Sequence, residues 1–432
     1  MFGFIKRQSP VRLIAVGFLL VILLGSLLLK LPFSVREGVE LSYIDSLYTS
    51  TSAVCVTGLV VVDAYDTFTP VGQTILAFLI QIGGLGVTAV SAGVILLIGR
   101  KMDLKSRNLV REAMSLDSGR GVVRFLRDVF VTTLTIELIG AILSFIVFVQ
   151  EFPVPRAIGL SLFHAVAAFN NSGFDILGGG QNLIPYHDHV MLNLITCALI
   201  FFGGIGFLVI KEMWTERMRW KRFSMHSKVV LSVSLVLTVL GTGLLYLTED
   251  ITWLEAFFAS VTTRTAGFST CNYGTFSNAG ILVMIVLMFI GASPGSTGGG
   301  IKTSALFALF QGLKSAATNK SEKAFHYALP KDAFRRAATI VLMALTVILT
   351  ASFALMALEP HLPMRDILFE MTSAFGTVGL TTGITTQLSV ASKVVSMLVM
   401  FIGRLGPLTI ASVWYFSRGE RVRYPEGNLT VG

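Results

Sequence analysis

Charge is scarce in this sequence. Acidic and basic side chains together make up 14% of its 432 residues, whereas soluble globular domains carry about 25%. Apolar side chains account for 53%, and the mean hydropathy is +0.74. A chain so rich in apolar residues and so poor in charge is neither a disordered segment nor a soluble cytosolic enzyme. The composition indicates a protein embedded in a membrane.

Cysteine and histidine are also few. The three cysteines, Cys55, Cys197 and Cys271, are too far apart for a disulfide framework or a metal cluster. The six histidines include no H-E-x-x-H pair, and no G-x-G-x-x-G segment marks a dinucleotide site. We therefore expect neither an enzyme nor an organic cofactor in this chain. A membrane-embedded hydrolase and an assembly scaffold without transport remain competing hypotheses, which a flux assay in proteoliposomes separates.

Long uncharged apolar stretches are abundant instead. A helix needs roughly 20 apolar residues to cross a bilayer. The first stretch continues into Lys30-Leu31-Pro32 without a cleavage pattern, so we interpret it as a span and not as a signal peptide. The predicted spans are residues 12–31, 70–99, 123–149, 189–211, 228–247, 277–310, 333–358 and 388–417.

Basic residues orient these spans. The net charge is +9, and most of the 34 Lys and Arg residues lie in five segments. Since Lys and Arg collect in cytoplasmic loops, the segments predict a multi-pass protein of the plasma membrane with both termini in the cytoplasm. The same placement favours contact with anionic membrane lipid over binding to nucleic acid. The five segments are residues 1–12, 100–127, 211–228, 314–336 and 418–432.

Between the two spans of each pair lies a segment too short and too polar to cross. Irregular backbone at membrane depth is tolerated only where protein buries it or where it lines a water-filled cavity. We therefore predict an all-α polytopic membrane protein, with eight transmembrane helices and four re-entrant pore helices around a central pore. The predicted pore loops are residues 43–60, 157–175, 252–269 and 364–382. The four span–loop–span repeats cover residues 1–110, 111–220, 221–325 and 326–432, the last with a short cytoplasmic tail.

The four loops share one pattern around Gly58, Gly173, Gly267 and Gly379. An aromatic residue lies ten positions before each glycine, and a bulky apolar residue follows it. A ring of four loops can offer backbone carbonyls in place of an ion's hydration shell, and glycine reaches positive φ without strain. The preceding helices would aim their partly negative C-terminal ends at the cavity, which favours a cation. The alternative is that these glycines are close-packing points between helices.

The third repeat departs from this symmetry. Pro294 and the run Gly298-Gly299-Gly300 interrupt its inner helix over residues 292–303, because such a stretch cannot remain helical. A phosphate-binding loop is disfavoured, since Ile301 precedes Lys302 where that motif has glycine. A passive helix kink is the other alternative. We prefer a gate, a loop beneath the filter that blocks the cavity.

Arg404 stands at the matching height of the fourth inner helix. A charge at that depth is costly unless it is paired or wetted, which makes it a functional candidate. Snorkelling to the boundary at Arg418 is disfavoured, because the distance is roughly 21 Å at 1.5 Å per residue. We expect Arg404 to bind carbonyls and hydroxyls of the gate loop, and Lys302 to act similarly. The predicted gate comprises Ala292, Ser293, Pro294, Gly295, Ser296, Thr297, Gly298, Gly299, Gly300, Lys302, Thr303 and Arg404.

Other polar residues are weaker candidates. Glu137, inside a span, is either a coupling site or a hydrogen-bonded structural carboxyl. Arg264 is expected to brace the third loop, and His187 and His189 to lie in a solvated outer loop without a metal. Four carboxylates at or near pore-helix starts are expected to complement the helix dipoles, with attraction of cations as an addition: Asp45, Glu255, Asp366 and Glu370.

With these motifs the chain resembles the membrane subunit of the Trk/Ktr/HKT superfamily of potassium transporters, and most of all the KtrB type. The longer TrkH type has an additional pair of N-terminal spans. The resemblance implies potassium selectivity at Gly58, where sodium-passing members carry serine, and an intramembrane gate at residues 292–303. The implied potassium-binding filter residues are Val56, Thr57, Gly58, Asn171, Ser172, Gly173, Thr265, Ala266, Gly267, Thr377, Val378 and Gly379.

The resemblance also implies partners and ions. It implies a homodimer on a cytosolic KtrA-like ring of RCK type that binds ATP or ADP. The basic segments 100–127 and 211–228 either touch that ring or serve only topology and lipid contact. Potassium is the implied transported ion, and sodium is implied as a symported or regulatory ion. The alternative within the superfamily is a sodium-permeable or TrkH-like cation transporter.

Overall fold

The computed structural model describes residues 10–98, 104–114 and 121–414 of the chain. These residues are mainly helical, as predicted, with one small antiparallel hairpin of β1 (Lys323–Ala324) and β2 (Tyr327–Ala328) that the sequence did not predict. Lys323 pairs with Ala328 and Ala324 with Tyr327. Parts of the basic segments 1–12 and 100–127, and all of 418–432, lie outside the described residues.

Four helices are long and apolar enough to cross a membrane. They are α2 (Pro10–Lys30), α8 (Val122–Phe148), α12 (Met225–Thr248) and α16 (Ala333–Leu358). Each corresponds to the first predicted span of a repeat. Leucines on their outer faces are largely exposed. A helix that is hydrophobic on all sides is typical of a membrane span, whose outer face contacts lipid. Leu134, Leu235 and Leu342, for example, are 63%, 66% and 65% exposed.

The second spans are broken helices, which corrects the prediction of continuous ones. α5 (Pro70–Leu85) meets α6 (Val87–Leu97) at 99°, and α10 (Val190–Ile205) meets α11 (Phe207–Thr215) at 100°. The breaks fall at Gly86 and Gly206, whose φ angles of 86° and 93° interrupt the helical backbone. If each bent pair is one span, the described residues hold six candidate spans.

The other two second spans are interrupted as well. α14 (Asn278–Phe289) is separated from α15 (Thr303–Thr318) by the predicted gate loop, and α18 (Val390–Leu405) meets α19 (Pro407–Trp414) at Gly406. Neither pair is among the candidate spans identified by length and composition in the described residues. Eight membrane crossings therefore stay a prediction.

A short helix begins each predicted pore loop: α3 (Tyr43–Cys55), α9 (Val154–Phe169), α13 (Trp253–Thr262) and α17 (Met364–Gly376). Their starts follow from local sequence. The Ser42 hydroxyl accepts from the Asp45 N–H at the start of α3, and Thr252 forms a capping box with Glu255 at the start of α13. Proline directly precedes the other two helices.

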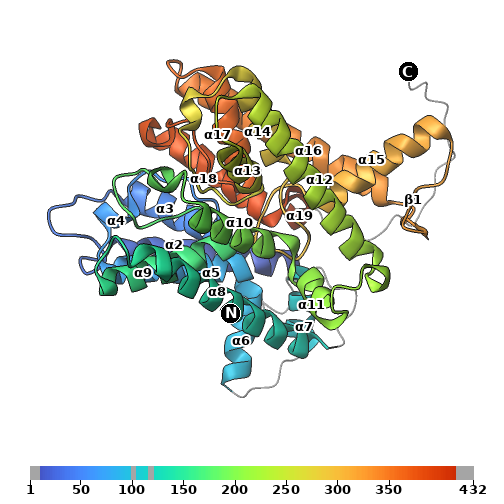
Figure 1. The fold of residues 1–432 in the computed structure, drawn as a ribbon, viewed down its shortest axis with the longest axis horizontal. Helices are drawn as coiled ribbons and strands as arrows, with labels where there is room; N and C mark the ends of the chain where they lie inside the picture. The colour runs from blue at the N-terminus through green and yellow to red at the C-terminus, as the bar shows by residue number, and fades with distance from the viewer. Residues whose placement is uncertain (1–9, 99–103, 115–120, 415–432) are drawn as a thin grey trace.

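Each short helix packs against the long first helix of its own predicted repeat, and α3, α9 and α17 also pack against the inner helix that follows. α3 contacts α2 and α5, α9 contacts α8 and α10, α13 contacts α12, and α17 contacts α16 and α18. The repeats also meet each other through α3 with α18, α5 with α9, α10 with α13, and α14 with α17. In Figure 1, α15 and the β hairpin project to one side of the bundle. The remaining elements are α4 (Ala64–Thr67), α7 (Leu104–Ala113) and the short 3-10 turns η1 (Ile184–Tyr186), η2 (Trp220–Arg222), η3 (Tyr273–Thr275) and η4 (Thr385–Gln387).

Candidate functional site

The four pore loops share an unusual backbone conformation. Val56, Asn171, Thr265 and Thr377 all adopt positive φ, between 50° and 74°. Left-handed backbone is costly for β-branched side chains, so the same choice in four loops is maintained by the surrounding structure. Two residues later each loop turns again at its glycine. The φ angles are 92° at Gly58, 67° at Gly173, 81° at Gly267 and 94° at Gly379.

The four glycines form a closed ring. A Cβ on Gly58 would overlap the Ser172 carbonyl oxygen of the second loop, and one on Gly173 would lie 2.8 Å from the Ala266 oxygen of the third. A Cβ on Gly267 would overlap the Val378 oxygen of the fourth loop, and one on Gly379 would overlap the Thr57 oxygen of the first. Each loop therefore abuts the next, and the fourth returns to the first. Glycine is required at all four junctions both by φ and by space.

Hydroxyl groups hold two of these loops in the same way. Ser52 accepts a 3.0 Å hydrogen bond from the Gly58 N–H, and Ser373 accepts one of 3.0 Å from the Gly379 N–H. In the third loop the Thr262 hydroxyl donates to the Phe268 carbonyl at 2.7 Å. The backbone of these three predicted filter segments is thus tied to the helix that precedes it.

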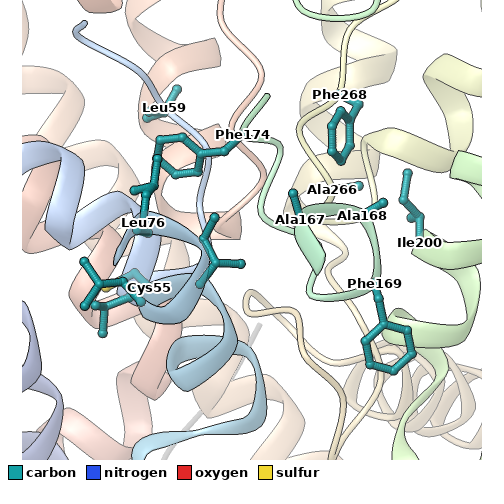
Figure 2. Packing of buried hydrophobic residues seen from close by; sticks show 14 of the residues in the cluster. Cys55, Leu59, Leu76, Ala167, Ala168, Phe169, Phe174, Ile200, Ala266 and Phe268 are labelled. Carbon is teal, nitrogen blue, oxygen red and sulfur yellow. The ribbon is translucent and has the colours of Figure 1, made fainter. Parts of the chain in front are cut away.

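The apolar residues that follow the glycines pack around the outside of the ring. Figure 2 shows Phe174, which follows the second glycine, beside Leu59, which follows the first, with Leu76 of α5 beneath them. Phe268 stands above Ala266 in the third loop. Leu59, Phe174 and Phe268 are at most 1% exposed. These side chains explain the bulky apolar residue after each glycine, because each packs its loop against the neighbouring helices.

A cavity of about 320 Å³ opens on one side of the ring. All four loops line it, through Gly58, Phe174, Gly267 and Gly379. The carboxylate of Asp175 also lines the cavity, and burial raises its pKa to about 6. A space of this size accommodates an ion with part of its hydration shell.

Asn182 connects two loops at the rim of this cavity. Its Nδ2 donates to the Gly173 carbonyl and to the Asp175 carboxylate, each at 3.0 Å. Its Oδ1 accepts from the Ser269 N–H at 3.1 Å. Sequence analysis missed this residue, because it lies nine positions beyond the second filter glycine in an irregular segment. The signal that marks it, a left-handed φ of 52°, is a property of the folded backbone and is not visible in the sequence.

The predicted gate loop lies on the other side of the ring. The Gly299 N–H donates to the Thr377 hydroxyl of the fourth loop at 3.0 Å, and a Cβ on Gly298 would overlap the Thr265 hydroxyl of the third. The Thr297 hydroxyl donates to the carbonyls of Phe169 and Gly203 in the second repeat, at 3.2 and 3.1 Å. The loop therefore contacts three repeats directly beneath their filter segments.

Arg404 and Lys302 hold this loop through its carbonyl groups. Arg404 donates from Nη1 to Thr297, and from Nη2 to Gly83 and, at 3.1 Å, to Gly84 at the end of α5. The Lys302 ammonium donates back to the Gly298 carbonyl at 2.7 Å. The arginine thus joins the gate loop to the first repeat, a second anchor that sequence analysis did not predict.

Glycines of the inner helices show how the third repeat differs. A Cβ on Gly83, Gly203 or Gly403 would overlap a carbonyl at the end of the pore helix of the same repeat: Val54, Phe169 or Phe375. A Cβ on Gly291 would instead overlap the carbonyl of Gly299 in the gate loop. In the third repeat the predicted gate loop thus occupies the place beside this glycine that the end of the pore helix occupies in the other three repeats.

Comparison with known proteins places this architecture. The family model for TrkH, described as a cation transport protein, matches residues 13–248 and 233–415. The chain is 36% identical to the Ktr system potassium uptake protein B of Bacillus subtilis, over 99% of this chain and 97% of that protein. It is also 36% identical to the potassium/sodium uptake protein NtpJ of Enterococcus hirae, over 99% and 98%.

The chain belongs to the TrkH family of cation transport proteins. It is therefore a membrane transporter and not an enzyme. A crystal structure of the potassium transporter TrkH from Vibrio parahaemolyticus has the same fold, with a TM-score of 0.74 at 18% identity, over 95% of this chain and 87% of that one.

Two of the weaker candidates in this TrkH-family chain are buried among neutral partners. Arg264 is 8% exposed, and its guanidinium donates to the carbonyl and hydroxyl of Ser234 on α12 at 3.2 and 2.9 Å. This contact agrees with a bracing role for Arg264. Glu137, 6% exposed, accepts from the Asn170 amide at 3.0 Å.

The carboxylates near the pore-helix starts differ in role. Asp45 and Glu255 lie in first turns, where Asp45 also pairs with Lys393 of α18 at 2.7 Å. Glu370 lies midway along α17, fully buried and hydrogen-bonded to the Thr385 hydroxyl, so it does not serve the first turn.

The two outer histidines each have a polar contact. His187 lies 3.1 Å from the Glu255 carboxylate, and His189 caps α10 by accepting from the Leu192 N–H at 3.2 Å. The prediction of a merely solvated loop therefore overlooked both contacts.

Proposed function

We propose that this chain takes up potassium through a filter made of its four pore loops. The ring closed by Gly58, Gly173, Gly267 and Gly379 is the observation that carries the proposal. The ring holds the carbonyls of Thr57, Ser172, Ala266 and Val378 at its four junctions. Carbonyl oxygens held in place can replace the hydration shell of a potassium ion. The relatives named as potassium uptake proteins support potassium as the ion.

The loop of residues 292–303 is the gate in this proposal, and the described conformation is closed. Hydrogen bonds join the loop to the second and fourth repeats beneath the filter. Arg404 joins it to the first repeat. An ion leaving the filter meets this loop, and the positive charges of Arg404 and Lys302 repel it. Conduction requires the loop to move away from the filter.

The signal for this movement comes, in our proposal, from a cytosolic partner. The names of two relatives place them in a Ktr system, which supports an assembly of this chain with other subunits. We propose a homodimer in the plasma membrane, with both termini in the cytoplasm, on an RCK-type ring that binds ATP or ADP. Co-purification from native membranes tests it, and full nucleotide-regulated flux by the purified chain alone would contradict it.

Sodium permeation is the second candidate function. The relative from Enterococcus hirae is named as a potassium/sodium uptake protein, which favours a sodium-permeable transporter as the second candidate. Glycine at position 58 favours potassium selectivity, with sodium as a coupled or regulatory ion.

Rescue of a cell deficient in potassium uptake tests the proposal. We expect the chain to restore growth at low potassium, and added sodium to stimulate uptake without replacing potassium. Restored sodium entry with no gain in potassium uptake would favour the second candidate, and no rescue by a well-expressed chain with its partner would contradict both.

A further inference from the structure

A buried polar cluster lies where the first two repeats meet. Its centre is the Asn170 amide, at the end of α9 and next to the filter segment of the second loop. Asn170 Nδ2 lies 2.8 Å from Gln81 Oε1 on α5, 3.0 Å from Glu137 Oε1 on α8 and 2.9 Å from the Val166 carbonyl. One amide thus joins three helices inside the membrane region.

The cluster has more acceptors than the amide has hydrogens. Asn170 Nδ2 carries two hydrogens and faces three oxygens. Glu137 is hydrogen-bonded to both Gln81 and Asn170, and among the described residues no charged side chain bonds to it. A carboxylate buried among neutral amides is unfavourable, and a proton on Glu137 supplies the missing donor. A neutral Glu137 therefore suits this cluster better than a carboxylate, and Asn170 Oδ1, which is buried without a hydrogen-bond partner among the described residues, is an acceptor of the same amide that is still open.

The cluster contacts Gly84 of α5, one of the residues whose carbonyls bind Arg404. Asn170 packs so closely on Gly84 that a Cβ there would overlap its Oδ1. The Gly84 carbonyl accepts from Arg404 at 3.1 Å, and Arg404 also binds the gate-loop carbonyl of Thr297. A shift of Asn170 therefore moves the α5 carbonyls on which Arg404 is anchored.

We propose that Glu137, carrying its proton, is a positioning residue for the gate. It fixes Asn170 against Gly84, and so keeps the carbonyls of Gly83 and Gly84 where Arg404 can hold the gate loop closed. Glu137 acts through Asn170 and does not touch the ion. This inference rests on the proposed potassium pore and its gate, and adds to it a control point on α8, outside the gate and the filter.

Potassium flux through the full chain in proteoliposomes, without its partner, tests this role. Glu137→Ala should raise the resting flux about fivefold or more, a typical coupling between linked sites, with the potassium-to-sodium ratio unchanged. Glu137→Gln should match the parent, because glutamine replaces the neutral acid with a donor of the same shape. Asp128→Asn is the matched control, since Asp128 lies on the same helix but pairs with Lys211 at 2.8 Å.

A double variant separates positioning from general loosening. If Glu137 acts through the Arg404 anchor, Glu137→Ala should add little to the flux of Arg404→Ala, because contacting residues in one network are not additive. Parental flux in Glu137→Ala, a Gln variant as leaky as the Ala variant, or fully multiplied effects in the double variant would each overturn the inference.

Two further outcomes are assigned in advance. Should Glu137→Ala fail to fold, Gln81→Leu removes the opposite side of the cluster and carries the same expectation, so that parental flux in Gln81→Leu overturns the inference. A folded chain that carries no potassium even with most of residues 292–303 deleted defeats the proposed function itself, whereas a conducting deletion variant beside an unaltered Glu137→Ala defeats only the role of Glu137.

Discussion

A side chain at any of the four filter glycines would occupy space that the neighbouring loop already fills. The sequence predicted these positions, because a glycine recurring at one place in four repeats is visible without coordinates. It could not predict why glycine is needed, since the obstacle is a carbonyl of another repeat. Asn182 was invisible for a related reason: its partners Gly173 and Ser269 meet only after folding.

Replacing Gly58 tests the ring at the residue scale. Overpacking costs about 1–3 kcal/mol, so Gly58→Ala or Gly58→Ser should lower discrimination of potassium against sodium by about 5- to 150-fold. Competition by sodium in a potassium-uptake assay measures it. Gly38→Ala is the matched control, because Gly38 has a φ of 83° with open space around it. Unchanged competition in both Gly58 variants would mean that the glycine is only a packing point.

Asn182→Ala tests the tie between the second and third loops. Each lost hydrogen bond contributes about 0.5–1.5 kcal/mol, so the half-saturating potassium concentration should rise several-fold while protein yield is maintained. Asn319→Ala is the control, because Asn319 has a similar φ of 51° at the end of α15. Equal potassium affinity in the two variants would show that Asn182 does not position the filter.

At the scale of elements, the four long helices agree with the predicted spans within a few residues, whereas the inner helices do not. Composition cannot distinguish a straight apolar helix from one bent by 99° at Gly86, because glycine is common in membrane helices for packing reasons. The interruption of the third inner helix was predictable, since Pro294 and three consecutive glycines exclude a helix. The contacts of residues 292–303 with the second repeat were not, because they depend on the bend at Gly206.

Arg404 joins two elements, so its removal should free the gate. We expect Arg404→Ala, and deletion of most of residues 292–303, to raise potassium flux and weaken its dependence on the partner, with selectivity little changed. The flux of Arg404→Lys should lie between those of the parent and Arg404→Ala, because an ammonium lacks the fork that reaches Thr297 and Gly84 together. A deletion variant that folds and assembles yet transports no faster than the parent would make this stretch a structural kink.

Glutamates at the ends of α12 and α16 cap the following inner helices. Glu249 accepts from the Ser277 hydroxyl before α14. Glu359 accepts from the N–H of Ser389, just before α18, at 2.8 Å and from the hydroxyl of Ser392, in the first turn of α18, at 2.7 Å. Hydrogen bonding, above all from the Ser389 hydroxyl and then from the Ser392 hydroxyl and the Ser389 N–H, lowers the pKa of Glu359. A carboxyl whose pKa is lower in the folded state than in the unfolded state stabilises the folded protein at pH values above the unfolded-state pKa. That stabilisation is lost as the pH falls through the folded-state pKa.

Glu359→Ala should therefore destabilise the protein by about 1–3 kcal/mol at neutral pH, and the difference from the parent should shrink at acidic pH. Thermal unfolding in detergent at several pH values measures both effects. The exposed Glu40→Ala is the control. A variant as stable as the parent at pH 7 would show that the cap does not contribute.

At the scale of the whole molecule, four similar units form one ring, and the interrupted inner helix of the third repeat lies beneath it. The cyclic order was not predictable from the repeats alone, because several arrangements of four units share the same local pattern. The structure shows it through the glycine contacts, in which each loop abuts the next and the fourth returns to the first.

The central claim is that this ring selects potassium, and ion flux in proteoliposomes tests it most directly. The purified chain with most of residues 292–303 deleted is reconstituted under matched gradients of potassium or sodium, so that the gate does not limit the rate. We predict potassium flux well above sodium flux, and loss of that difference when Gly58→Ser is added. Equal fluxes of the two ions before that substitution, or no potassium flux from a folded chain, would contradict the account.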